Sequence, residues 1–219
     1  GSETVELTLA SPVNSTLAAN NPHTVTITDD EGVPDVDFKL ASSSIGEAET
    51  TIDVAVSITG ASVNPITVDY SVTGGSATIG AGNDFELVAG QVVFPATTTA
   101  DQAFTVTIHD DSVFEGSETI TLTLASPVGA NLAGTNNPHT LTITDDETTP
   151  QVTFVAGSSS VGEAETTQNI AVSITGESTQ SITVDYVING STDAATPSDY
   201  TLTAGSVIFP ANTTADQNI

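Results

Sequence analysis

The chain has 219 residues, and 28 of them are Asp or Glu against a single Lys39 and no Arg, so the formal net charge is −27. A surface this acidic repels phosphate groups, which excludes nucleic acids and anionic membrane surfaces as partners. The absence of Cys excludes disulfides and thiol chemistry, and no apolar run approaches the roughly 18 residues needed to insert across a membrane.

Internal repetition dominates the sequence. Three pairs of segments recur at an offset of 115 or 116 residues: 1–31 with 116–147, 42–51 with 158–167, and 94–102 with 209–217. A period near 115 residues has the size of a domain rather than of a solenoid repeat. The repetition therefore predicts the end of one repeat at residues 1–32, a complete repeat at residues 33–147 and the beginning of another at residues 148–219.

The complete repeat alternates apolar and polar residues with the period of two that indicates β-strands. In chain order, the predicted strands lie around Val36–Leu40, Val54–Ile58, Ile66–Val72, Val92–Phe94, Phe104–Ile108, Ile120–Leu124 and Leu141–Ile143. Clusters of Gly, Pro, Asn, Asp and Ser separate them, and no stretch has a helical period. About seven short strands in each repeat favour an all-β fold of tandem, Ig-like antiparallel β-sandwiches.

Acidic residues collect at four places in the complete repeat, each at a strand end or in a loop. In chain order they are Glu47; Asp84; Asp110, Asp111, Glu115 and Glu118; and Asp145, Asp146 and Glu147. Strand ends meet at the two poles of a sandwich. If these loops share one pole, nine carboxylates lie together without a basic partner, and such like charges destabilise a fold unless something neutralises them.

Calcium is the counter-ion that this pattern favours. Ca²⁺ takes six to eight oxygen ligands in irregular geometry, whereas Mg²⁺ demands a tight octahedron and Zn²⁺ favours His or Cys. Nine carboxylates exceed the needs of one ion, so we expect two or more Ca²⁺ ions at a complete site. The alternative is that the acids are solvated surface charge, for example an adaptation to high salt.

The sequence gives no sign of catalysis, so we do not expect an enzyme. Glu47 and Glu49 could form a carboxylate pair of the glycosidase kind, but no aromatic platform accompanies them. Motifs for a nucleophilic serine or a phosphate-binding loop are absent. His23 and His139 occupy matching NPHT segments, and we interpret both as turn residues.

The segments ITVDY, GNDFELVAGQVVFPA, FTVTIHDDSVFEGSETITLTL and HTLTITDDE follow one another in the complete repeat. Their order resembles that of the Calx-beta domain, which is known from sodium/calcium exchangers, an integrin subunit and large bacterial surface proteins. The resemblance covers the whole chain. It implies that the same nine acids hold calcium and that the backbone carbonyl of Val113 is a further ligand. Ser112 departs from the exchanger pattern, which has a third acid there, and Glu147 replaces an Asp.

The partial repeats at the two ends carry some of the same acidic positions. These are Glu3, Asp29, Asp30 and Glu31 near the start of the chain, and Glu163 and Asp199 near its end, and we expect them to be calcium ligands as well. The eleven residues equivalent to 105–115 are missing between the two partial repeats. We expect the parent chain to continue through both ends, with completion by strand addition between neighbouring protomers as the alternative.

The expected function follows from the repeats and the acids. We expect a calcium-binding structural module of an extracellular or cell-surface fibre or adhesin, in which Ca²⁺ at the junctions between repeats makes the array rigid. Its partners would be neighbouring repeats of the same or an identical chain. The alternative is a calcium-sensing regulatory domain of a membrane transporter or receptor. A ligand-binding adhesin tip would need an aromatic or variable loop that breaks the repeat, and none is present.

Overall fold

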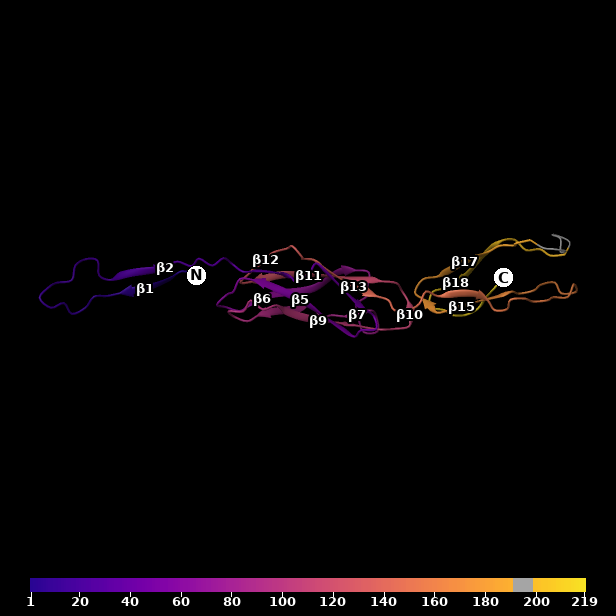
Figure 1. Ribbon diagram of the computed structural model, residues 1–219, viewed down its shortest axis with the longest axis horizontal. Helices are drawn as coiled ribbons and strands as arrows, with labels where there is room; N and C mark the ends of the chain where they lie inside the picture. The colour runs from indigo at the N-terminus through magenta and orange to yellow at the C-terminus, as the bar shows by residue number, and fades with distance from the viewer. Residues whose placement is uncertain (191–198) are drawn as a thin grey trace.

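The computed structural model describes residues 1–190 and 199–219, and within these residues every regular element is a β-strand. Figure 1 shows three parts in a row: a hairpin at the N-terminal end, a sandwich in the middle and a smaller set of strands at the C-terminal end. The described residues contain no helix, and hence none that could cross a membrane. The prediction of an all-β fold built from sandwiches is confirmed.

The middle part is a sandwich of two five-stranded sheets. The first sheet has the order β4-β13-β11-β6-β8, formed by Ser42–Gly46, His139–Thr144, Glu118–Val128, Ile66–Gly75 and Gly90–Phe94. The second sheet has the order β12-β3-β5-β9-β7, formed by Asn131–Leu132, Asp35–Phe38, Thr51–Thr59, Gln102–Ile108 and Phe85–Glu86. Most neighbours are antiparallel, but β4 runs parallel to β13 and β12 runs parallel to β3.

The alternating pattern places the apolar side chains of both sheets in one core. On β11, Ile120, Leu122 and Leu124 are buried, and on β5 the buried residues are Val54, Val56 and Ile58. Thr side chains occupy the opposite, outer face of β11. Burial of these β-branched and aliphatic side chains is the main force that holds the two sheets together.

The structure differs from the predicted elements in a few places. Short strands β4, β7 and β12 were not predicted, because each carries too few alternating apolar residues to give a signal. Leu40 was assigned to the first strand, but β3 ends at Phe38 and Leu40 is 60% exposed. His139 is not a turn residue: it begins β13 and is buried, with Nδ1 2.7 Å from the carbonyl oxygen of Leu40 and Nε2 2.9 Å from Oγ of Ser43.

The two end parts hold fewer strands. Strands β1 (Glu3–Leu7) and β2 (His23–Ile27) form an antiparallel hairpin, and all residues of the two strands are exposed. The C-terminal part contains a three-stranded sheet and a two-stranded sheet, formed by β14 (Gln151–Phe154), β15 (Ala171–Thr175) and β19 (Gln217–Asn218), and by β17 (Ile182–Tyr186) and β18 (Gly205–Phe209). A small core of Val172, Ile174, Val207 and Phe209 lies between these sheets. The proposed division into three repeats at residues 32 and 147 stays a prediction.

One small sheet joins the middle part to the C-terminal part. Strand β10 (Val113–Phe114) pairs in parallel with β16 (Glu177–Ser178), and the amide of Thr179 donates to the carbonyl of Phe114 over 3.3 Å. A cavity of 280 Å³ lies beside this pair, lined by residues of both parts that include Phe114, Glu115, Pro150 and Ile182. The loop that carries β10 therefore contacts the C-terminal part directly.

Candidate metal centre

The parallel pairing of β4 with β13 brings two groups of acids to the same end of the sandwich. Gly46 lies opposite Thr144 in the register of these strands, and the amide of Glu47 donates to the carbonyl of Thr144 over 2.9 Å. Because neighbouring parallel strands end on the same side of a sheet, Glu47, which follows β4, and Asp145, which follows β13, lie side by side.

The loop between β9 and β11 approaches the same end. Glu118 begins β11 and lies opposite Ile143 of the antiparallel β13, so the start of β11 lies next to the end of β13. Just before it, the amide of Gly116 donates to Oδ2 of Asp145 over 3.0 Å. Gly116 has a φ of 81°, a left-handed conformation that glycine adopts without strain. This turn holds Glu115 over the end of β13.

The remaining acids come from the second sheet. Strand β7 pairs with the end of β9, and the amide of His109 donates to the carbonyl of Asp84 over 3.0 Å. Asp84 therefore lies beside the residues that follow β9, where Asp110 and Asp111 begin the loop. Asp84 and Asp111 are each fixed by a backbone amide, from Thr78 and Val113 respectively.

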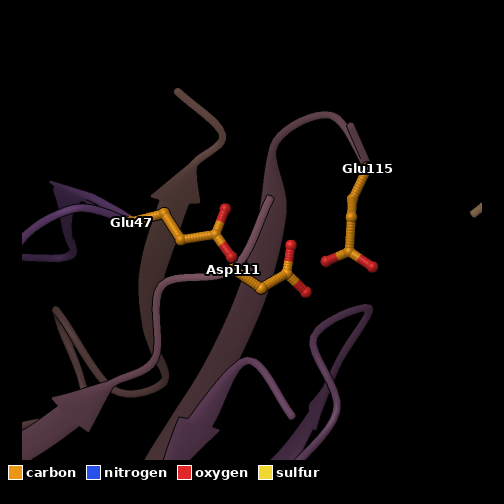
Figure 2. Close-up of side chains that lie close together, drawn as sticks. All are labelled: Glu47, Asp111 and Glu115. Atoms are coloured by element: carbon orange, nitrogen blue, oxygen red, sulfur yellow. The ribbon is translucent and has the colours of Figure 1, made fainter. Parts of the chain in front are cut away.

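The structure gathers all nine predicted acids of the complete repeat at this one pole, which we call the acidic pole. Four overlapping groups have ligand atoms within 4.8 Å of one another: Glu47, Asp111 and Glu115; Glu47, Asp145 and Glu147; Asp84, Glu115 and Glu118; and Asp110, Asp146 and Glu147. Figure 2 shows the first group, in which Glu47 and two residues of the loop between β9 and β11, Asp111 and Glu115, turn their carboxylates toward a shared space. Because the groups share members, they form one continuous cluster.

The carboxylates repel one another and are partly removed from water. Burial and then the charge of Asp111 raise the pKa of Glu47 to about 7. Burial and a hydrogen bond with Asp84 raise the pKa of Glu118 to about 7, and burial and a hydrogen bond to Asp145 raise the pKa of Glu147 to about 7. The pKa of Glu115 is also raised, first by burial and then by Asp84. All four shifts disfavour the charged form.

Two oxygen atoms of the acidic pole are buried without a hydrogen-bond partner. They are Oδ1 of Asp145 and Oε2 of Glu147, which belong to the same group as the buried Glu47. Buried polar atoms are normally paired, and an unpaired one calls for a ligand or a proton. Lys39, the only Lys of the chain, does not neutralise these acids, because its Nζ lies 2.6 Å from Oδ2 of Asp101. The pole can therefore accept cations.

The predicted ligands of the end parts are not gathered in the same way. Among the described residues, none of Glu3, Asp29, Asp30, Glu31, Glu163 and Asp199 belongs to a group of three potential metal ligands. Asp29 instead pairs with the amino group of Gly1 at 3.1 Å. Val113, predicted as a carbonyl ligand, lies in β10 and belongs to the junction with the following repeat. The sequence predicted calcium at the junction between repeats but not this strand pairing, because pairing between repeats leaves no local pattern.

The raised pKa values predict how stability depends on pH in the presence of a chelator. The folded protein binds protons at Glu47, Glu118 and Glu147 up to about pH 7, whereas the unfolded chain releases them near the ordinary value of 4.5. Because the folded state binds more protons than the unfolded state in this pH range, the free energy of unfolding falls as the pH rises. The melting temperature should therefore drop between about pH 5 and about pH 7.5. Calorimetric melts at several pH values test this, and a curve that rises over the interval would contradict it.

Comparison of the sequence with protein families gives a match to the family described as Calx-beta domain. The match covers residues 28–147 and again residues 145–219, so two tandem segments account for most of the chain. No curated protein gives a significant match.

Solved structures similar to this chain include three of Calx domains. The crystal structure of the apo-form Calx CBD1 domain is 28% identical over 52% of this chain and 99% of that chain, with a TM-score of 0.47. The CBD12 structure from CALX1.2 is 24% identical over 84% of this chain and 73% of that chain, with a TM-score of 0.48. The calcium binding domain CBD12 of CALX1.1 is 23% identical with the same coverage and the same TM-score.

Proposed function

The chain belongs to the Calx-beta domain family, and from this premise and the geometry of the acidic pole we propose that it is a calcium-binding structural repeat module. In this proposal, Ca²⁺ binds at the junction between consecutive repeats and fixes their relative orientation. The observation that carries the proposal is the group of Glu47, Asp145 and Glu147, where buried carboxylate oxygens without partners face like charges.

The residues of the acidic pole suit calcium better than the other common divalent ions. All nine side chains supply oxygen ligands, and most belong to loops that can adjust to an ion with six to eight ligands. Hydrogen bonds from the amides of Gly116 and Val113 hold Asp145 and Asp111 in place. Bound Ca²⁺ would supply positive charge to carboxylates that otherwise repel one another, which favours their charged forms.

The place of the acidic pole in the fold supports a role at the junction. Glu115 directly follows β10, the strand that pairs with β16 of the next repeat, and only three residues separate Glu147 from β14, the first strand of the next repeat. Ions that order the loop of residues 109–118 would also order its pairing with β16. A short linker and a paired strand then leave the two repeats little freedom to swing.

This role fits an array of repeats outside the cell or on its surface. The near-identical repeat sequences suit a fibre or an adhesin stalk, where every junction performs the same task. The partners in that case are neighbouring repeats of the same chain or of an identical chain.

The test of the proposed function is a comparison of Ca²⁺ with Mg²⁺. In protein freed of metal with a chelator, millimolar Ca²⁺ should raise the melting temperature by about 4 °C or more, the shift that about 1 kcal/mol gives in a domain of this size. Mg²⁺ at the same concentration should have a much smaller effect, because it gives up its water ligands reluctantly. Equal effects of the two ions would mean that the pole only senses ionic strength.

A further inference from the structure

The loop between β6 and β7 carries Asp84 to the acidic pole, and little apolar burial holds this loop in place. Asp84 is the only acid among residues 76–84, and most of these residues are exposed. Ile79, the largest apolar residue of the loop, is itself 50% exposed. The position of the Asp84 carboxylate therefore depends mainly on hydrogen bonds.

One end of the loop is fixed to the second sheet, and the loop is folded on itself. The amide of His109 donates to the carbonyl of Asp84, and β7 pairs with β9 directly after it. Within the loop, the amide of Thr78 donates to the carboxylate of Asp84. The amide of Gly80 donates to the carbonyl of Phe85 over 2.9 Å. The segment from Thr78 to Asp84 thus forms a closed unit.

The other end of the loop is held against β11 of the first sheet by Thr119. The amide of Thr119 donates to Oγ of Ser76 over 3.0 Å, and the amide of Ser76 donates to Oγ1 of Thr119 over 3.4 Å. We call these two bonds the Ser76–Thr119 clasp. The amide of Ala77 also donates to the carbonyl of Thr119 over 3.0 Å. Because Thr119 directly follows Glu118, the clasp ties the loop to the neighbour of one of the acids.

Gly75 explains why a side chain takes over from the backbone at this point. It is the last residue of β6 and lies opposite Ile120. Its φ is 126°, and a Cβ on it would collide with the carbonyl oxygen of Thr119, so only glycine allows the two strands to approach this closely. Beyond Gly75 the regular pairing of β6 with β11 ends, and the hydroxyl of Ser76 accepts from the amide of Thr119 instead.

The clasp matters because one group of acids joins the two sheets. The ligand atoms of Asp84, Glu115 and Glu118 lie within 4.8 Å of one another. Asp84 is fixed to the second sheet, whereas Glu118 begins β11 of the first. Carboxylates this close repel one another, so an exposed loop without an anchor would carry Asp84 away from the other two. The clasp opposes that movement.

We propose that Ser76 is a positioning residue of the cation site, an inference that rests on the proposed function. Through its hydroxyl, Ser76 keeps the carboxylate of Asp84 close to those of Glu115 and Glu118 before an ion binds. Ligands that are already in place lose less conformational freedom on binding than mobile ones. Without the hydroxyl, the ion must also order the loop, and the affinity for Ca²⁺ falls.

Calorimetric titration of the full chain with Ca²⁺ tests this role in three variants. Ser76→Ala removes the hydroxyl and should weaken binding by about fivefold, within the range of one hydrogen bond. Ser76→Thr keeps a hydroxyl and should bind like the parent. So should Thr73→Val, which removes a hydroxyl that lies 2.7 Å from Oγ1 of Thr123 between the same two strands and outside the acidic groups. Equal affinities of Ser76→Ala and Thr73→Val would overturn the inference.

A double-mutant cycle shows whether Ser76 acts through Asp84. Asp84→Asn keeps the shape of the side chain and an oxygen that accepts from the amide of Thr78, but it removes the ligand charge. If Ser76 serves to place that charge, Ser76→Ala should weaken binding much less in the Asp84→Asn background than in the parent. The same loss of affinity in both backgrounds would show that Ser76 does not act through Asp84 and would overturn its positioning role.

Melting curves of the metal-free variants separate a positioning role from a structural one. Ser76→Ala and Thr73→Val each lose an exposed hydrogen bond, so their melting temperatures should be similar. A lower melting temperature of Ser76→Ala without a loss of affinity would overturn the inference and leave the proposed function intact. Absence of calcium binding by the parent protein would overturn both.

Discussion

Replacing Glu47 by glutamine should stabilise the metal-free protein and weaken calcium binding by about tenfold or more. Glu47 is only 4% exposed and belongs to two of the four groups of the acidic pole. Glutamine has the same shape without the charge, so it relieves repulsion with Asp111, Glu115 and Asp145. The same change removes a ligand charge from the cation. A metal site predicts this combination of a higher metal-free stability and a lower calcium affinity. Melting curves measure the stability, and a calorimetric titration measures the affinity.

The matched control is Glu49→Gln. Glu49 lies two residues further along, is exposed and belongs to none of the groups, so the same change in net charge should leave both the melting temperature and the calcium affinity nearly unchanged. If the two variants behave alike, overall charge rather than a defined site governs the response to calcium.

Calcium should make the two consecutive repeats behave as a stiffer and longer particle, because it orders the loop that pairs β10 with β16. Small-angle scattering of monomeric protein should give a larger maximum dimension and a narrower cross-section in calcium than in a chelator. The variant Asp146→Asn, which removes one acid of the group formed with Asp110 and Glu147, should lose most of this change.

The variant Thr179→Pro tests whether the small sheet transmits the effect. Proline removes the amide that donates to the carbonyl of Phe114, and Thr179→Ala keeps that amide. The proline variant should bind calcium normally and stay flexible, whereas the alanine variant should stiffen like the parent. Scattering curves that are identical with and without calcium in the parent would show that the ions do not act on the junction.

The sequence was sufficient for the long strands, and the reason is the strength of the alternating pattern. Strands β5 and β11 each bury three aliphatic residues at alternate positions. Such alternation indicates a strand with one buried face and does not fit the period of a helix. Strand β4 was missed because Ile45 is its only large apolar residue and its other members are Ser and Gly. It exists through its backbone pairing with β13, and a sequence pattern does not reveal such pairing.

The acids could be assigned to strand ends from the sequence, but their convergence on one pole could not. That convergence depends on the parallel direction of β4 and β13 and on the contact of Asp84 with the end of β9. The acids of the end parts, such as Asp29 and Glu163, illustrate the same point. They occupy equivalent sequence positions yet form no group among the described residues, where no sheet joins the N-terminal hairpin to the C-terminal part.

The most direct test of the central claim, calcium binding at the acidic pole, is a calorimetric titration of chelator-treated protein with Ca²⁺. Binding is expected in the micromolar to millimolar range of calcium-binding modules, with two or more ions for the complete repeat, and it should be weakened by Glu47→Gln. Absence of heat, together with an unchanged melting temperature in millimolar Ca²⁺, would contradict the claim and leave the nine carboxylates as surface charge.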